Sequence, residues 1–431
     1  MFTYFLLIWP FIYSNARLST QDGGTEIYSI FSFIGPEIRY LEAFLFIVLN
    51  VYIYILYIFS KSKVNQLTTN IFLLFFWVCL VSIVSIAEGL VPTTYIFRAS
   101  YELLCPFLVF NIASKLNLDQ KTIDNFIKVL FVFMIINCIT IFHQFLFMFN
   151  GVFVDGDYFR GIFSDAHVQA IFSYSSALFI ISNKNYLKKF FYIIPINIFC
   201  AFLSSNEKAS IFFLIVCLLI IFSKLSRRNI FISLLVMIFI LININFFIYT
   251  FSPRILEYSD NFSFIELLYY SGPFQMFLIL FEQFSMSFKN IFFGIGPSLF
   301  GGPSSISLIQ NFMAPNYIAD IFYVEAFGQF NFLPLSGFFS KSSFYLTILG
   351  EFGIIVFLIF ILLLKNVFIY LFKSNNNVLR KPLLYIFIFI LLCALLSSYS
   401  VWDSQIVLTP FFLILSFLIL NNQSENCETE S

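Results

Sequence analysis

The chain has 431 residues, of which 60% are apolar and only 11% are charged, and its formal net charge is zero. Soluble domains carry about 25% charged residues, so this composition excludes a protein that faces water on all sides. The sequence also lacks a basic run, which excludes a nucleic-acid-binding protein. The 7 cysteines form no CxxC pair, so the sequence indicates neither a metal site nor a disulfide framework.

Long apolar runs divide the whole chain. A helix needs about 20 apolar residues to cross a bilayer. Runs of this kind, separated by polar breaks, lie at residues 2–14, 40–60, 70–88, 94–114, 123–149, 166–182, 190–204, 209–223, 229–250, 342–364, 383–400 and 405–420. The sequence therefore predicts an all-α, polytopic membrane protein with twelve spans, of which the first and the seventh are the weakest.

These runs predict four parts of the chain. They are nine spans within 1–250, a large loop at 251–341, three spans within 342–420 and a short tail at 421–431. The first run has no basic residue before it and no small-residue cleavage site after it. We therefore interpret it as a short span rather than as a signal peptide.

Basic residues predict the orientation of the spans. They gather in alternate loops, as Lys61 and Lys63, Lys115 and Lys121, Lys184, Lys188 and Lys189, Lys224, Arg227 and Arg228, and Lys373, Arg380 and Lys381. Loops rich in Lys and Arg face the cytoplasm. Both termini are then cytoplasmic, and the large loop is on the outer, periplasmic side.

The large loop has two distinct segments. Residues 273–288 are apolar but too short to cross a membrane, so they predict a helix that lies in the interface or against the bundle. Residues 294–303 are rich in Gly and Pro and predict a turn.

Arg160, Asp165 and His167 form a compact polar group just before the sixth span. A guanidinium suits bidentate binding of phosphate. A nearby carboxylate or imidazole could take a proton from a hydroxyl group. The alternatives are an interfacial arginine that reaches water, and a histidine that is an ordinary residue at a helix N-terminus.

Other charged residues on the outer side also need an explanation. Lys208 and Lys341 lie near span ends, where the alternatives are a local pair with Glu207 and an interface anchor, respectively. Glu351 lies about two helical turns inside a span and should face the interior of the bundle, paired or protonated. Arg98 and Glu102, four residues apart in the fourth span, are expected to form an i,i+4 pair. His143 of the fifth span is expected to be a buried packing residue.

Three segments resemble the Wzy-type O-antigen polymerases, within the larger family of O-antigen polymerases and ligases. They are Arg160-Gly-Ile-Phe-Ser-Asp165, Lys289-Asn-Ile-Phe-Phe-Gly-Ile-Gly-Pro297 and Lys341-Ser-Ser with Glu351-Phe-Gly353. The order of the segments and the large loop before the last spans also resemble this family. Ala166 replaces a common proline, and Ser342 stands where the ligases usually have a catalytic histidine.

The resemblance implies a fold like the C-type glycosyltransferases and a metal-independent, inverting glycosyl transfer without a cofactor. The substrates would be polyprenyl-diphosphate-linked oligosaccharides, polymerised into an O-antigen or a capsule at the bacterial inner membrane. A chain-length regulator protein is a candidate partner. The catalytic candidates are Asp165, His167 and Glu351, and the candidate diphosphate ligands are Arg160, Lys208, Arg254 and Lys341. The alternatives are an O-antigen ligase and a flippase or other transporter of lipid-linked oligosaccharides.

Overall fold

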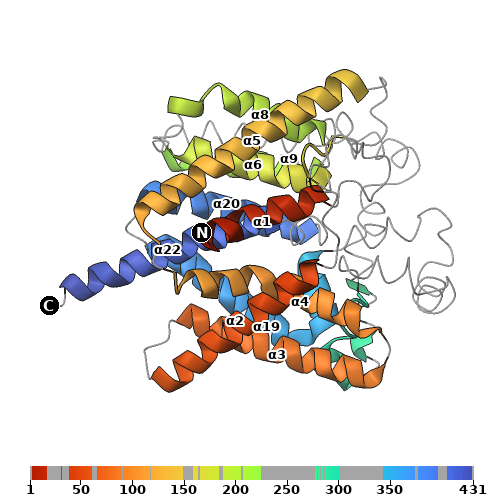
Figure 1. Cartoon of the computed structure of the whole chain (residues 1–431). Coiled ribbons are helices and arrows are strands. Elements are labelled where there is room, and N and C mark those ends of the chain that lie inside the picture. The colour runs from red at the N-terminus through yellow and green to blue at the C-terminus, as the bar shows by residue number, and fades with distance from the viewer. Residues whose placement is uncertain are drawn as a thin grey trace.

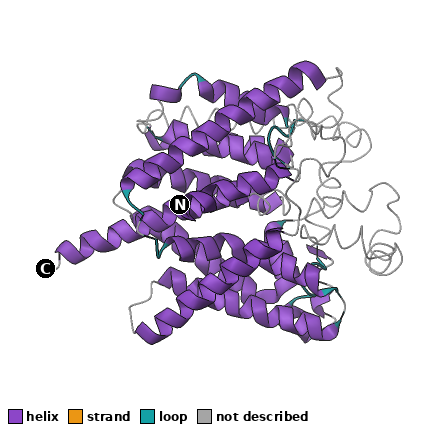
Figure 2. Ribbon diagram, in the orientation of Figure 1, coloured by secondary structure: helices purple, strands orange, loops and turns teal. Residues whose placement is uncertain are grey.

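The computed structural model describes the chain in separate ranges. They are residues 2–16, 31, 38–60, 66–89, 91–116, 118–148, 159–163, 166–183, 188–204, 207–224, 277–278, 280–281, 283–285, 287–300, 343–373, 377–396 and 405–429. Within these ranges the regular structure is helical and contains no strand (Figure 2). The all-α prediction is confirmed for this part of the chain.

Helices occupy eleven of the twelve predicted spans. They are α1 (Phe2–Ala16), α2 (Ile38–Ser60), α3 (Gln66–Glu88), α4 (Thr93–Ala113), α5 (Gln120–Met148), α6 (Ala166–Ser182), α8 (Ile193–Leu203), α9 (Glu207–Lys224), α19 (Phe344–Lys373), α20 (Asn377–Leu396) and α22 (Gln405–Thr429). The short helix α15 (Phe288–Phe293) precedes the predicted Gly/Pro turn. The predicted ninth span, 229–250, lies outside the described residues.

Within the described part of the chain, six helices are long and apolar enough to cross a membrane, namely α2, α3, α4, α5, α19 and α20. The apolar segments of α1, α6, α8, α9 and α22 are 10–17 residues long. The two spans that the sequence marks as weakest both belong to this shorter set, and α8 has only 11 residues. These helices are consistent with a polytopic membrane protein.

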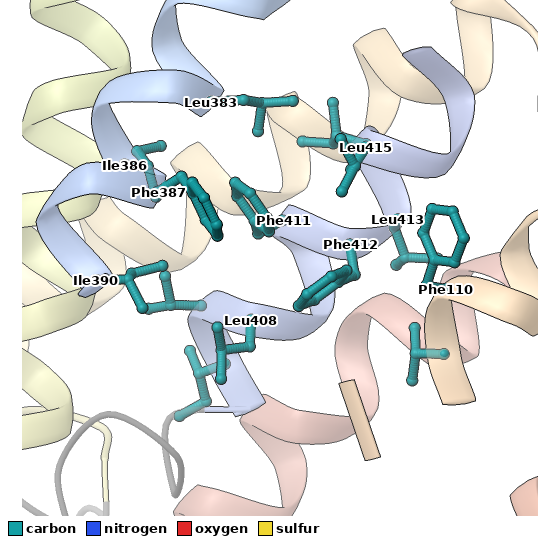
Figure 3. Packing of buried hydrophobic residues seen from close by; sticks show 14 of the residues in the cluster. Phe110, Leu383, Ile386, Phe387, Ile390, Leu408, Phe411, Phe412, Leu413 and Leu415 are labelled. Atoms are coloured by element: carbon teal, nitrogen blue, oxygen red, sulfur yellow. The ribbon is translucent and has the colours of Figure 1, made fainter. Parts of the chain in front are cut away.

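Helices α4 and α22 form the centre of the bundle. Every residue of α4 from 99 to 113 is buried, as is every residue of α22 from 406 to 419. A helix that is buried all round belongs inside a bundle. Phe107 of α4 packs edge-on against Phe412 of α22, with 5.2 Å between the ring centroids. In Figure 3, Phe110 of α4 also lies beside this contact.

The opposite side of α22 packs against α20. The rings of Phe387 and Phe411 are stacked, with their centroids 5.7 Å apart. Figure 3 shows Leu383, Ile386 and Ile390 on the same face of α20. The helix α22 therefore joins α20 to α4 through aromatic and branched aliphatic side chains.

Helix α2 has a surface that suits lipid rather than water. Large apolar side chains are exposed along its length, including Leu41, Phe44, Val48, Tyr52 and Phe59. A continuous apolar face of this kind is unfavourable in water. In hydrocarbon it leaves no unsatisfied polar group, because the helix satisfies its own backbone.

The helices lie in three groups (Figure 1). Helices α5, α6, α8 and α9 lie on one side of α1, α20 and α22, and α2, α3, α4 and α19 lie on the other side. Within this last group, Asn50 of α2 donates to the carbonyl oxygen of Leu108 in α4 at 3.2 Å, and Asn111 of α4 donates to the hydroxyl of Tyr54 at 2.7 Å. Such bonds hold helices together where the hydrophobic effect does not.

Helix α5 begins at an acidic cap. The Oδ1 atom of Asp119 accepts a hydrogen bond from the backbone N–H of Thr122 at 2.9 Å, which satisfies a donor of the first turn. This bond and one from the Thr122 hydroxyl lower the pKa of the Asp119 carboxyl. The cap fixes the start of the helix that carries the buried amides described below.

Candidate functional site

The first candidate site centres on residues 159–163, here called the Arg160 turn. The backbone N–H of Phe163 donates to the carbonyl oxygen of Arg160 at 3.1 Å, which closes the turn just before α6. The side chain of Phe163 is fully buried. Its ring lies 5.0 Å from that of Phe172 in α6 and 6.1 Å from that of Phe11 in α1. The half-buried Arg160 therefore belongs to a turn that is anchored in the bundle.

Two amides of α5 hold the backbone of this turn. The Oε1 atom of Gln144 accepts from the N–H of Gly161 at 3.0 Å, and its Nε2 atom donates to the carbonyl oxygen of Gly161 at 3.3 Å. The N–H of Ile162 donates to Oδ1 of Asn137 at 3.3 Å. Both main-chain groups of the residue that follows Arg160 are thus bonded to one side chain.

Gly161 is required at this position. Its φ angle is +61°, in the left-handed region that side chains disfavour. A Cβ atom there would also overlap the Oδ1 atom of Asn137. The glycine that directly follows Arg160 therefore has a local structural reason.

Asn137 belongs to a buried polar network with Gln169, Ser173 and Asn197, which Gln144 joins only through the backbone of the Arg160 turn. Its hydrogen bonds link Asn137 Nδ2 to Ser173 Oγ (3.4 Å), Gln169 Nε2 to Ser173 Oγ (3.1 Å), Gln169 Nε2 to the Cys200 carbonyl (3.3 Å) and Asn197 Nδ2 to the Ser173 carbonyl (2.6 Å). All five members are at most 4% exposed. The network joins α5, α6 and α8.

Charged residues and histidines within the spans predicted the candidate sites, whereas these uncharged amides were not predicted to take part. The signal was present nonetheless. Asn137 and Gln144 are seven residues apart, which places them on one face of a helix. Uncharged amides inside apolar spans are costly unless they are hydrogen-bonded, so their presence predicts hydrogen bonds within the bundle.

The proton acceptors predicted beside Arg160 have different outcomes. His167 lies in the first turn of α6, and its Nδ1 atom is buried. Asp165 lies outside the described residues. The structure thus places His167 at the end of α6 that adjoins the Arg160 turn, while the role of either residue as a base stays a prediction.

The second candidate site centres on residues 294–300, here called the loop turn. The predicted Gly/Pro turn is confirmed over this range. The N–H of Ile295 donates to the carbonyl oxygen of Gly350 in α19 at 2.7 Å. The N–H of Phe300 donates to Oε1 of Glu351 at 3.3 Å. Glu351 is only 2% exposed, which confirms that it faces the interior, and the loop turn supplies one of its hydrogen-bond donors.

Three glycines permit this close packing. Gly353 interrupts α19 with a φ angle of +79°, and Gly294 has a φ angle of +74°. A Cβ atom at Gly353 would overlap the Phe292 carbonyl, one at Gly294 would overlap the Glu351 carbonyl, and one at Gly350 would overlap the Phe300 ring. The backbones of the loop turn and α19 therefore touch directly.

The same segment also contacts α3 and α4. Lys289 of α15 forms an ion pair with Glu88 at the end of α3, with 2.6 Å between Nζ and Oε2. The hydroxyl of Ser298 donates to the carbonyl oxygen of Tyr95 in α4 at 2.8 Å. Of the predicted interfacial helix 273–288, the described residues 277–278, 280–281 and 283–285 are helical.

Three other candidate cations have no described side chain. Lys208 lies in the first turn of α9. Arg254 and Lys341 lie outside the described residues. The predicted pair of Arg98 and Glu102 is confirmed, with 2.8 Å between Nε and Oε1.

The expectation for His143 was wrong. The helix register turns this side chain to the surface, where its ring centroid lies 4.5 Å from that of Phe147. Apolar periodicity alone does not show which face of a span is buried, because the lipid-facing side is apolar as well.

The two sites lie on different helices. The Arg160 turn contacts α5 and α6, and the loop turn contacts α4 and α19, with α1, α20 and α22 between these groups (Figure 1). Of these two sites, only the Arg160 turn includes an arginine. Neither the models of known protein families nor the curated protein sequences give a match to this chain.

Proposed function

We propose that this protein is a membrane glycosyltransferase that polymerises polyprenyl-diphosphate-linked oligosaccharide repeat units on the periplasmic face of the bacterial inner membrane. The product would be an O-antigen or a capsular polysaccharide. The observation that carries the proposal is the fixed backbone of the Arg160 turn at the end of α6. The resemblance of three sequence segments to Wzy-type polymerases supports the same function.

The chemistry explains why an arginine is needed there. An acceptor hydroxyl attacks the anomeric carbon of the donor sugar, and the bond between that carbon and the diphosphate breaks. The hydroxyl proton passes to a base, for which Asp165 and His167 are the candidates. Negative charge grows on the departing polyprenyl diphosphate, and donors fixed in advance stabilise this charge most effectively. Arg160 is the principal donor in this proposal, with Lys208, Arg254 and Lys341 as further candidates.

Glu351 has a different role in the proposal. It accepts a hydrogen bond from the backbone of the loop turn, so it fixes this turn against α19. A carboxylate held in this way supports the shape of the outer surface. We retain it as a candidate catalytic residue of lower rank than Asp165 and His167, because its described contact is to the protein itself.

Contacts at the helix ends support the proposed sidedness with twelve spans. On the side assigned to the cytoplasm, Asn183 donates to the carbonyl oxygen of Val378 at 3.2 Å. On the side assigned to the periplasm, Lys289 pairs with Glu88. Both members of each pair fall on one side in the prediction from basic residues.

The same contacts support the ninth predicted span. Helix α19 has 30 residues and separates the loop turn from the end that leads to Val378. Helices α8 and α9 form a hairpin, so α9 should end at Lys224 on the side of Asn183. Lys289 is then on the opposite side, and the chain between them must cross the membrane. The uncharged apolar run 229–250 has the length for that crossing.

Substitution of Arg160 tests the function. In cells, Arg160→Ala should leave single repeat units on the surface lipid in place of long glycan chains. With purified protein and the lipid-linked repeat unit, the rate should fall by about 100- to 1000-fold, as for the loss of one charge-stabilising donor. Arg160→Lys keeps the charge but loses the bidentate geometry, so an intermediate rate is expected.

A matched control is Lys289→Ala, which removes another outer cation that Glu88 already engages. It should leave the distribution of glycan lengths unchanged. Immunoblots must show equal amounts of each variant in the membrane. Full-length glycan with unchanged banding in Arg160→Ala would contradict the proposal. Deletion of the gene separates the alternatives, because loss of a ligase leaves no units on the surface lipid and loss of a flippase strands them on the cytoplasmic leaflet.

A further inference from the structure

We infer that Gln144 and Asn137 are positioning residues, which hold the Arg160 turn so that the guanidinium meets the diphosphate of the substrate. This inference rests on the proposed function and deepens it. Neither residue carries a charge, and neither belongs to the segments that resemble a known family. They are assigned by their hydrogen bonds alone.

Gln144 has the chemical groups that this task requires. A primary amide can accept and donate at once. Gln144 uses both abilities on Gly161, at 3.0 Å to the N–H and 3.3 Å to the carbonyl oxygen. Asn137 accepts from the next N–H, that of Ile162, at 3.3 Å. Three main-chain groups directly after Arg160 are therefore fixed to one face of α5.

The amides are themselves held in place. Asn137 donates from Nδ2 to Ser173, and Asn197 of α8 donates to the carbonyl oxygen of the same Ser173. Gln144 is 4% exposed and Asn137 is fully buried. Low exposure strengthens these bonds and makes their loss costly. A displacement of about 1 Å at a charge-binding group can reduce a rate about 100-fold, so such support has a functional consequence.

A purely structural role for the network makes a different prediction. Buried amides between membrane helices also stabilise packing. Gln169 serves as an internal comparison for that role. It is fully buried in the same network, but its amide bonds to Ser173 and Cys200 rather than to the turn.

The experiment measures the dissociation constant of polyprenyl diphosphate for the purified protein in nanodiscs. Gln144→Met removes both bonds to Gly161 with little change in side-chain volume. We expect it to weaken binding by about 10- to 100-fold. Gln169→Met is the matched control, and because Gln169 reaches the turn only through Ser173 and Asn137, this substitution should change the dissociation constant much less than Gln144→Met does. Equal effects of the two substitutions would overturn the inference.

Double substitution tests whether Gln144 acts through Arg160. In an Arg160→Ala background, Gln144→Met should cause no further loss of binding. Independent, multiplicative losses would overturn the inference, because residues that act as one unit are not additive. If the single substitution Arg160→Ala leaves the binding of polyprenyl diphosphate normal, the proposed function fails. If Arg160→Ala weakens binding but Gln144→Met does not, the positioning role fails and the proposed function stands.

Gln144→Glu covers the case in which Gln144→Met does not fold. A protonated carboxyl both donates and accepts, as the amide does, whereas the ionised form only accepts. The affinity of Gln144→Glu relative to the unsubstituted protein should therefore recover as the pH is lowered. A ratio that stays constant over the pH range would overturn the inference.

Discussion

Gly353 has a backbone conformation and surroundings that exclude any side chain. Its φ angle is +79°, and its position lies against the Phe292 carbonyl and the backbone nitrogen of Gly294. We expect Gly353→Ala to lower the free energy of unfolding by roughly 2–6 kcal/mol, the sum of backbone strain and overpacking. Thermal unfolding of the protein in detergent would measure this loss.

Gly89→Ala is the matched control for that substitution. Gly89 also has a left-handed φ angle, +68°, but a Cβ atom there would meet nothing within 4 Å. It should therefore show only the backbone cost, about 1–2 kcal/mol. Equal stability losses at the two positions would show that the contact between the loop turn and α19 does not form.

The sequence predicted the burial of Glu351 but not its partner. An acidic residue two turns inside an apolar span must be paired or protonated, which follows from the cost of a charge in the membrane. One of its partners is a backbone N–H at Phe300, 51 residues earlier in the chain. No spacing rule connects residues so far apart.

At the scale of elements, the loop turn and α3 are close enough to be joined covalently. A Cβ atom at Gly296 would lie 3.9 Å from the Cβ atom of Ser85. This separation is in the range of natural disulfides, about 3.5–4.5 Å. Under the proposed sidedness, Ser85→Cys combined with Gly296→Cys should therefore form a disulfide in cells despite the strain of a side chain at φ +133°, because the periplasm is oxidising. Mass spectrometry of peptides from non-reduced protein would identify the cross-link.

The control pair is Gly89→Cys with Gly296→Cys, since a Cβ atom at Gly89 contacts nothing. It should give no cross-link, and neither should the single substitutions, although native cysteines are present. A cross-link that appears only after cell lysis would indicate that this segment faces the cytoplasm. That result would contradict the proposed sidedness.

The helices themselves were largely predictable. Most predicted spans begin and end within a few residues of the helices, as for α2 and α6, because a bilayer requires continuous apolar segments. Helices α19 and α22 end well beyond their predicted spans, since polar residues continue a helix outside the apolar region. The break of α19 at Gly353 was not predicted, because a glycine within a span often serves packing alone.

For the whole molecule, the orientation of the spans leads to a direct prediction. Reporter enzymes that are active only in the periplasm should be active when fused after residue 300 and inactive when fused after residue 377. The reason is the alternation of basic loops, together with the contacts of α15 and the loop turn with those ends of α3 and α4 that the prediction places outside.

The reverse pattern of reporter activity would reject the proposed topology. Activity after both positions would instead indicate that α19 does not cross the membrane. A fusion after residue 226 is a useful third measurement, because inactivity there together with activity after residue 300 would require a crossing within the intervening segment.

The sequence by itself determined that this chain is a helical membrane protein, because composition and the length of apolar runs depend only on local chemistry. It also indicated Arg160 and Glu351 as charged residues that need a structural explanation. Only the tertiary structure decided what holds them. The bonds from Gln144 to Gly161 and from Phe300 to Glu351 join segments that are adjacent in space and not in sequence. The packing of the helices brings these segments together, and contact with the surrounding lipid does not determine that packing.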